Sequence, residues 1–519
     1  MAELLVLMTE RTPGQTALAD EQTSMTWAEL DHKVNQWIGV LRAHGLRAGD
    51  RVAMVLGNRP VTYEVLLACL HTGLVAVPVS WRLTAPELAY LLTDSGAAAV
   101  LAEPSTAGRV AAAMREARHS PRLAMVAGDQ PRDGLVPTED LLAGATAAEP
   151  AGQSTGSVML YTSATTGRPK GVITGLFRCG AGLDQTRRTV GGLGAAFGIP
   201  ERGRSLLVGP WYHAAQIFFS LFPLLRGCEL VLRRRFDAAA TITDFAEREI
   251  TLCHLVPTQF VRMLALPPAD RESFRGGCLE RVWHGGAACP VEVKRRMIDW
   301  WGPVFVEYYA ATEAGIVTTI DSAEWLARPG SVGKPRPPTE VLIVDGDGAE
   351  CPAGVTGSVY VRRPSKLDFE YHNAPGKTAD AHRAPGTFTV GDLGRLDEDG
   401  YLFLTGRTID TIISGGVNIY PAEVEAALLS HRSVRDVAVF GIPDDDFGET
   451  VMAVVEADPA AGLPPQDLPE ALDAHCRSQL AGYKRPRRYQ VVGSLPRHPT
   501  GKLDKQVLRA PYWKRGDAG

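Results

Sequence analysis

The chain has 519 residues, of which 45% are hydrophobic and 22% charged, and its formal net charge is −5. A chain of this length exceeds what one hydrophobic core supports, so more than one domain is expected, and the composition is that of a globular rather than a disordered or fibrous protein. The weakly acidic balance argues against a general nucleic-acid-binding protein, which would usually present a basic face.

The cysteines, the N-terminus and the longest uncharged stretch indicate a cytoplasmic protein. The eight cysteines include no CxxC pair, which favours buried free thiols in a reducing compartment over a zinc site. The N-terminus lacks the basic start and the cleavage site of a signal peptide and is expected to begin a helix. The uncharged stretch 65–81 is interrupted by His71, Gly73 and Pro78, so it predicts a buried helix and a strand, and no membrane span.

Apolar helical patterns alternate with short Val/Ile/Leu-rich runs from the start of the chain. Helices are predicted from Thr26 to His44 and over 61–73, and strands over 51–56, 74–80 and 97–103. Strands of continuous apolar residues, separated by helices, imply a largely parallel sheet covered on both faces.

The pattern changes after Gly330. Residues from about 330 to 406 are rich in Gly, Pro and Asp with short alternating runs, which predicts an antiparallel β unit. A compact α+β pattern follows, with Pro421 at a helix start. We therefore expect an α/β protein with two domains: an N-terminal domain of residues 1–408, with layered α/β sheets and the β-rich part at about 330–406, and a small mobile α+β C-terminal domain of residues 409–519.

The first chemically distinctive segment is YTSATTGRPKGV at 161–172. Its hydroxyls, its glycines and Lys170 are what a loop needs to hold phosphate oxygens, because hydroxyls and backbone N–H groups donate hydrogen bonds and the ammonium balances charge. The segment does not match the GxxxxGK[ST] pattern of a Walker A loop. On composition alone, a polar surface loop between two strands is the alternative to a phosphate-binding loop.

This segment resembles the phosphate loop of the adenylate-forming superfamily, which includes acyl-CoA and aryl-CoA synthetases, peptide-synthetase adenylation domains and luciferases. Stretches similar to further motifs of that family follow in family order. They are WYHAAQ (211–216), GGAACP (285–290), YYAATE (308–313), VGDLGRLDEDGY (390–401), GRTIDTIISGGVNIYPAEVE (406–425) and PTGKLDK (499–505). The resemblance is closest to stand-alone fatty-acyl and aryl-CoA ligases, and it implies an AMP-forming ligase that uses ATP and Mg²⁺.

The resemblance implies how the nucleotide is bound. The phosphate loop would hold the β- and γ-phosphates of ATP, Tyr309 would lie against the adenine ring, and Asp392, supported by Arg407, would accept hydrogen bonds from the ribose. The GGA stretch would form a wall where a larger side chain would clash. The implied nucleotide-binding residues are Thr162, Ser163, Thr165, Thr166, Gly167, Lys170, Gly285, Gly286, Ala287, Tyr309, Asp392 and Arg407.

The resemblance also implies catalytic residues. Lys502 would orient the carboxylate of the acid and offset charge as it attacks the α-phosphorus. Thr312 would touch the α-phosphate, and Glu313 would help to bind Mg²⁺, a hard cation that prefers oxygen ligands. His213 would gate the acid pocket, although a histidine beside apolar residues is often only a core group.

The implied acid pocket is formed by His213, Phe218, Tyr308 and Ala310. This aromatic and apolar set favours an aryl or medium-chain acyl acid over a dicarboxylate or an amino acid, although a plain hydrophobic core has the same composition. Coenzyme A (CoA) is the implied co-substrate, admitted along a channel at Gly415 and Gly416 after the C-terminal domain rotates.

The chain departs from the family pattern in three places. Ala164 and Ala310 stand where glycine is usual, so ordinary backbone angles or a narrowed pocket are expected there. The phosphate loop continues as ITGLFRCG, without the usual Thr-His pair. The hinge position, about which the C-terminal domain would rotate, is Ile409, where Asp or Lys is usual. A β-branched residue is stiff, so the sequence supports transfer of the activated acid to CoA less strongly than it supports formation of the adenylate.

The predicted reaction joins an acid and MgATP into an acyl-adenylate with release of pyrophosphate, after which CoA displaces AMP. An alternative is transfer to a non-CoA nucleophile in specialised metabolism: an amine, a carrier-protein thiol, or an aryl amine when nitrite is the activated acid, which would give a diazo product. A catalytically silent nucleotide-binding sensor is an alternative of another class. The expected partners are a small-molecule acid and ATP, with no nucleic acid, and a homodimer is left open.

Overall fold

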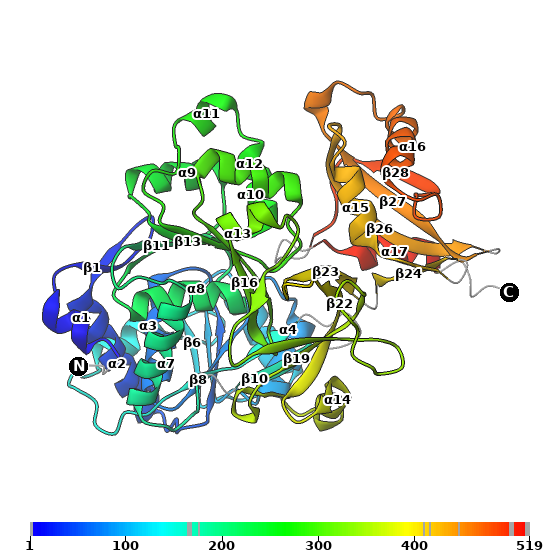
Figure 1. The fold of residues 1–519 in the computed structure, drawn as a ribbon. Helices are drawn as coiled ribbons and strands as arrows, with labels where there is room; N and C mark the ends of the chain where they lie inside the picture. Colours follow the sequence, from blue (N-terminus) through cyan, green and yellow to red (C-terminus); the bar gives the residue numbers. More distant parts are fainter. Residues whose placement is uncertain are drawn as a thin grey trace.

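The computed structural model describes residues 4–162, 169–174, 177–407, 410–414, 417–444, 447–497 and 503–513. Two mainly parallel sheets and the helices around them form the large N-terminal part of the molecule, and a β-rich unit and a smaller α+β unit follow along the chain (Figure 1). The predicted α/β class is confirmed. None of the helices in the described ranges is long and apolar enough to span a membrane.

The larger sheet has nine strands in the order β17-β16-β15-β14-β13-β11-β12-β1-β2. Its central strands are parallel, and antiparallel pairs lie at both edges. The strands are β1 (Thr16–Ala19), β2 (Ser24–Thr26), β11 (Arg204–Leu207), β12 (Glu229–Leu232), β13 (Leu252–Leu255), β14 (Arg281–His284), β15 (Phe305–Ala311), β16 (Gly315–Asp321) and β17 (Lys334–Pro335).

The second sheet has six parallel strands in the order β7-β6-β5-β3-β4-β8. Its strands are almost wholly apolar and buried, as expected when helices cover both faces. They are β3 (Arg51–Val55), β4 (Val75–Pro78), β5 (Ala99–Ala102), β6 (Leu123–Val126), β7 (Val136–Pro137) and β8 (Ser157–Val158).

Helices form three layers around the two sheets. Helices α2 (Trp27–Ala43), α3 (Pro60–His71), α7 (Leu183–Ala196) and α8 (Ala214–Leu225) share one core with both sheets. Helices α4 (Ala85–Ser95) and α5 (Ala107–Glu116) pack on the outer face of the six-stranded sheet. The outer face of the nine-stranded sheet carries α9 (Ala238–Glu247), α10 (Pro257–Leu264), α12 (Val291–Trp301) and α13 (Ser322–Ala327).

Short elements complete the N-terminal part. They are α1 (Val6–Arg11), α6 (Thr138–Ala143), α11 (Pro268–Glu272) and α14 (Pro375–Ala381), and a small antiparallel sheet of β9 (Leu160–Thr162), β10 (Lys170–Thr174) and β20 (Phe369–Tyr371). The small sheet joins the segment that leads into the predicted phosphate loop to the β-rich part of the chain.

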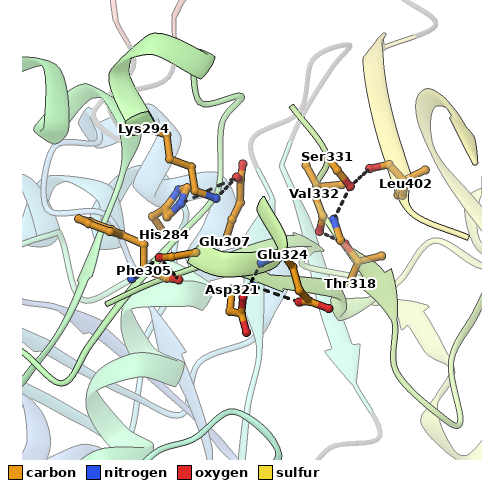
Figure 2. Close-up of polar contacts among 12 residues, drawn as sticks. His284, Lys294, Phe305, Glu307, Thr318, Asp321, Glu324, Ser331, Val332 and Leu402 are labelled. Carbon is orange, nitrogen blue, oxygen red and sulfur yellow. Dashed lines mark hydrogen bonds and ion pairs between the residues drawn. The ribbon is translucent and has the colours of Figure 1, made fainter. Parts of the chain in front are cut away.

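The predicted β unit is a five-stranded antiparallel sheet made of β18 (Glu340–Val344), β19 (Gly357–Arg362), β21 (His382–Ala384), β22 (Thr387–Leu396) and β23 (Leu402–Arg407). Polar contacts tie it to the nine-stranded sheet. The Ser331 hydroxyl donates to the Leu402 carbonyl at 3.0 Å, and the Thr318 hydroxyl donates to the Val332 carbonyl at 2.6 Å (Figure 2).

The C-terminal unit has one sheet with helices on both faces. Its strands are β24 (Ile412–Ser414), β25 (Val417–Ile419), β26 (Val434–Asp444), β27 (Gly448–Ala457) and β28 (Arg488–Val492). Helices α15 (Pro421–Leu429) and α16 (Leu468–Gln479) pack on one face, and α17 (Lys505–Trp513) packs on the other. This is the predicted α+β pattern.

All eight cysteines lie in the described ranges and are free. The predicted burial is confirmed for Cys69, Cys228, Cys253 and Cys476, but it is wrong for Cys179, which is exposed. Cys179 lies in the turn that precedes α7, and turns generally run over the protein surface.

Candidate active site

Strand β15 and the turn after it bring three groups of predicted site residues together. Side chains alternate across a strand, so neighbouring residues of β15 face opposite sides of the sheet. Tyr308 belongs to the core shared with α8, whereas Tyr309 belongs to the core of the β unit. Thr312 and Glu313 are half-buried in the turn that leads into β16.

Tyr309, Asp392 and Arg407 form a hydrogen-bonded chain. The Tyr309 hydroxyl donates to Asp392 Oδ2 at 2.6 Å, and Arg407 Nε lies 3.2 Å from Asp392 Oδ1. Asp392 and Arg407 face each other across β22 and β23, so the sheet register itself pairs them. Burial and the adjacent Asp392 carboxylate raise the pKa of Tyr309 well above its ordinary value, so the phenol stays protonated and remains a donor.

A second group consists of Lys170, Glu313 and Tyr371. The Tyr371 hydroxyl donates to Glu313 Oε1 at 2.7 Å, and Lys170 Nζ lies 4.4 Å from the centre of the Tyr371 ring. Burial and the neighbouring Lys377 lower the pKa of Lys170, while Glu313 opposes that shift. Nothing in the sequence pairs Tyr371 with Lys170, because only the pairing of β10 with β20 brings the two residues together.

Gly285, Gly286 and Ala287, the predicted wall of the nucleotide site, directly follow β14. A Cβ atom on Gly285 would lie 2.6 Å from the Tyr308 carbonyl oxygen and 2.7 Å from its ring, so a larger side chain would clash with Tyr308 at this position. At Gly286 an added Cβ would meet nothing within 4 Å, but φ is +78°, a value that favours glycine. Gly286 and Ala287 are exposed.

A buried ion pair lies beneath this wall. Lys294 of α12 donates to Glu307 Oε2 of β15 at 2.6 Å, and His284 Nε2 lies 3.9 Å from the same oxygen (Figure 2). Burial lowers the pKa of Lys294 and raises that of Glu307, and the mutual contact opposes both shifts. His284, Lys294 and Glu307 belong to β14, α12 and β15. Their contacts therefore connect the three elements next to the loop of residues 285–290.

The predicted acid-pocket residues lie along the core face of α8 and β15. The Phe218 ring stacks on Phe222 at 4.2 Å, and Phe219 stacks on Trp283 at 4.9 Å. His213 is half-buried at the start of α8, and Ala310 is half-buried at the end of β15. Among the described non-glycine residues, those with positive φ are Arg118, Asp133, Glu249 and Asn373, so Ala310 has the predicted ordinary backbone angles.

Two polar residues that sequence reasoning missed lie behind this aromatic set. His254 of β13 contacts the Gln216 amide nitrogen through Nδ1 at 2.9 Å and the Tyr308 hydroxyl through Nε2 at 2.7 Å. Burial lowers the pKa of His254 to about 3, so the imidazole is neutral and can donate through one nitrogen and accept through the other. Gln216 stands in the quoted WYHAAQ stretch, but nothing in the sequence pairs it with His254.

Several predicted site residues lie outside the described ranges: Ser163, Thr165, Thr166, Gly167, Ile409, Gly415, Gly416 and Lys502. Of Thr162, only the backbone is described, at the end of β9. The structure therefore brings together the nucleotide, wall and acid-pocket residues of the N-terminal part, and it does not place the hinge, the CoA channel or Lys502.

The described residues fit a magnesium ion that is bound together with phosphates. They contain no group of three or more His, Cys, Asp or Glu side chains arranged to hold a metal alone. Mg²⁺ in nucleotide sites is commonly held by one or two carboxylates plus phosphate oxygens and water. The half-buried Glu313 carboxylate, which accepts a hydrogen bond on one oxygen, matches that donor set.

Comparisons with known proteins identify the family of this chain. The family model described as AMP-binding enzyme matches residues 8–367, and the model of its C-terminal domain matches residues 423–502. A feruloyl-CoA synthase of an Amycolatopsis species is 34% identical over 512 residues, which cover 96% of each chain. A fatty acid–acyl-carrier-protein ligase of Streptomyces coeruleorubidus is 32% identical over 97% of this chain and 95% of the relative.

Among solved structures, the amide bond synthetase McbA from Marinactinospora thermotolerans superposes with a TM-score of 0.84 at 27% identity, covering 98% of this chain and 99% of that one. Enzymes of the matched family use ATP and Mg²⁺, and the CoA ligases among them also use CoA. The chain belongs to the AMP-binding, adenylate-forming enzyme family and is an AMP-forming ligase of the acid–CoA ligase type.

Proposed function

We propose that this enzyme is an acid–CoA ligase for aromatic acids. The observation that carries the aromatic class is the side-chain set on the core face of α8, β14 and β15. Phe218, Phe219, Trp283 and Tyr308 supply aromatic faces, and His254 beside them is neutral. Phe218 is half-buried, and Phe219, Trp283 and Tyr308 are buried in the same core. An aromatic lining of this kind would favour a flat apolar ring. The similarity to a feruloyl-CoA synthase supports the same class.

In the first half-reaction, we propose that the acid's carboxylate oxygen attacks the α-phosphorus of ATP and that pyrophosphate leaves. Lys502 would orient the carboxylate, and Thr312 would contact the α-phosphate. Thr162, Ser163, Thr165, Thr166, Gly167 and Lys170 would hold the β- and γ-phosphates. Mg²⁺, when bound, neutralises phosphate charge, and Glu313 would be its protein ligand.

The Tyr309–Asp392–Arg407 chain would hold the nucleoside. A carboxylate that accepts from Tyr309 on one oxygen and pairs with Arg407 on the other has a fixed orientation. Its remaining lone pairs would accept hydrogen bonds from the ribose hydroxyls. The Tyr309 ring would lie against the adenine, and Gly285, Gly286 and Ala287 would form the opposite wall.

In the second half-reaction, we propose that a C-terminal domain of residues 409–519 rotates about Ile409. CoA would then reach the adenylate along Gly415 and Gly416, and its thiol would displace AMP. His213, at the start of α8, would close the acid pocket. The domain boundary between residues 408 and 409 belongs to this proposal.

The experiment is incubation of the purified enzyme with MgATP and a panel of aryl and fatty acids plus nitrite, with or without CoA. Pyrophosphate release and mass spectrometry of the products are measured, with a Lys502→Ala variant as control. An aryl-CoA thioester from wild type and none from the variant is expected. Preference for straight-chain fatty acids would refute the aromatic class, and equal pyrophosphate release by the variant would remove Lys502 from the mechanism.

A second candidate is transfer of the activated acid to an amine or a carrier-protein thiol. Ile409 at the hinge position favours it, because isoleucine makes no polar contact that could stabilise either domain orientation. The relatives include a carrier-protein ligase and an amide bond synthetase. An adenylate that accumulates with CoA present and disappears when an amine is added would support this candidate over the CoA ligase.

A further inference from the structure

Tyr371 contacts two side chains of opposite charge that belong to different parts of the site. Its hydroxyl donates to Glu313 at 2.7 Å, and its ring lies beneath the Lys170 ammonium at 4.4 Å. Burial and Glu313 raise the pKa of Tyr371, so the phenol stays a donor. None of the ion pairs among the described residues joins Lys170 to Glu313, although the Glu313 charge acts on Lys170.

The backbone around Tyr371 fixes this side chain independently of the two charges. Tyr371 faces Val172 across β20 and β10, and its N–H donates to the Thr378 hydroxyl at 3.0 Å. The next residue, His372, donates its N–H to the Gly171 carbonyl at 2.7 Å. The ring therefore stands on a strand that is bonded directly to the strand of Lys170, while Glu313 reaches it from the turn after β15.

Tyr371 contacts both members of a potential ion pair. A glutamate and a lysine that are free to move attract one another, and the attraction grows as water is excluded. A hydroxyl that donates to the carboxylate leaves its second oxygen available to a metal. A ring face attracts a cation without removing its charge or its N–H donors. Each charge thus remains available to a ligand.

The charged residues near Lys170 suit a phosphate chain that is bound together with a metal cation. Lys377 and Asp380, both exposed on α14, act on Lys170 together with Glu313. Lys170 is thus influenced by a second lysine and two carboxylates, and one of these carboxylates, Glu313, accepts a hydrogen bond from Tyr371. Lys170 with Lys377 provides positive charge for phosphates, and Glu313 provides an oxygen ligand of the kind that Mg²⁺ prefers.

We propose that Tyr371 is a positioning residue for MgATP: it holds the Glu313 carboxylate toward the metal and the Lys170 ammonium toward the phosphates, and it prevents the two from pairing. The inference rests on the proposed roles of Glu313 and Lys170. It predicts that the hydroxyl of Tyr371 matters for the metal and that the ring matters for the phosphates.

The test uses Tyr371→Phe, which removes only the hydroxyl, and Tyr371→Leu, which removes the hydroxyl and the aromatic face. The control is Tyr401→Phe. The Tyr401 hydroxyl contacts Glu324 at 3.1 Å, and Arg328 and Lys334 lie 4.2 Å and 4.4 Å from its ring centre, so it makes the same kinds of contact elsewhere in the molecule. In the absence of an acid substrate, calorimetry measures the binding of MgATP and of ATP in EDTA. Pyrophosphate release in the presence of an acid is then measured as the Mg²⁺ concentration is varied.

Wild type and Tyr401→Phe are expected to bind MgATP more tightly than metal-free ATP. Tyr371→Phe should lose most of that difference and raise the KM for Mg²⁺ about tenfold, the size expected for one hydrogen bond to a charged group, with little change in kcat. Tyr371→Leu should in addition weaken binding of metal-free ATP. Rescue of Tyr371→Phe by high Mg²⁺ would separate positioning from a loss of fold.

The outcomes separate this inference from the proposed function. Tyr371→Phe with an unchanged preference for MgATP, or with a lower kcat at an unchanged KM for Mg²⁺, would overturn the positioning role even if wild type makes a thioester. A wild type that releases no pyrophosphate with any acid, but whose preference for MgATP depends on Tyr371, would overturn the proposed function and support the inference. Absence of MgATP binding in wild type would overturn both.

Discussion

At the residue scale, the proposed acid pocket lies against a buried histidine that is neutral. His254 lies between Gln216 and Tyr308, and Phe219 stacks on it at 5.1 Å. A protonated imidazole has no acceptor nitrogen, so protonation would break one of its two contacts. Burial lowers the pKa of His254, so this part of the core remains uncharged although it contains a titratable group.

Burial of His254 predicts a pH dependence of stability. Its pKa falls from 6.5 to about 3 in the folded protein. Between these values the unfolded chain binds a proton that the folded chain does not, so His254 costs stability as the pH falls below 6.5, at about 1.4 kcal/mol per pH unit. His254→Gln should therefore reduce the loss of unfolding free energy between about pH 6.5 and pH 5. His71, whose pKa falls to about 4, has the same sign and would remain in the variant.

Urea denaturation at several pH values measures this effect, with His32→Gln as the control because His32 is exposed. The control should show the wild-type pH dependence. An identical dependence in wild type and His254→Gln would contradict the assignment of a neutral, buried imidazole at this position.

At the element scale, the loop after β14, which contains Gly285, Gly286 and Ala287, is supported by contacts between α12 and β15. The Lys294–Glu307 pair fixes α12 against β15, and Gly285 lies directly against Tyr308. Removing one partner of a buried pair leaves an uncompensated charge, which is far more costly than the net worth of the pair. This pair therefore fixes α12 and β15, the elements that lie next to the proposed wall.

Gly285→Ala should displace this wall. The new methyl would lie 2.6 Å from the Tyr308 carbonyl oxygen, and backbone atoms in the middle of a sheet cannot shift cheaply. We expect a loss of about 1–3 kcal/mol in stability from overpacking. The displaced Tyr308 ring should raise the KM for the acid more than it lowers kcat, because Tyr308 belongs to the proposed acid pocket.

Gly286→Ala is the matched comparison, since it adds the same methyl one residue later into open space. Its cost should come only from the positive φ, about 1–2 kcal/mol, with a smaller change in the KM for the acid. Denaturation midpoints and steady-state kinetics of the two variants measure the contrast. Equal effects on KM from both substitutions would show that contact with Tyr308 does not define the wall.

At the scale of the whole molecule, the layers were predictable from the sequence and the contacts between layers were not. Buried parallel strands are continuous apolar runs, so the runs at 51–56 and 97–103 predict β3 and β5. The contact of His254 with Tyr308, 54 residues apart, depends on β14 lying between their strands. Similarly, Tyr371 reaches Lys170 only because β20 pairs with β10. Periodicity within an element carries no information about such pairings.

Coupling between the two parts of the chain can be tested at Ile409. If rotation about Ile409 limits transfer to CoA, Ile409→Asp should raise kcat for the thioester, because a carboxylate can make polar contacts in both orientations while isoleucine is stiff and apolar. Pyrophosphate release in the absence of CoA should stay unchanged, since adenylate formation precedes the rotation. Ile409→Val is the control, because it keeps the β-branch. Single-turnover measurements of adenylate formation and of adenylate decay separate the two steps. An unchanged decay rate in Ile409→Asp would mean either that rotation is not limiting or that CoA is not the acceptor.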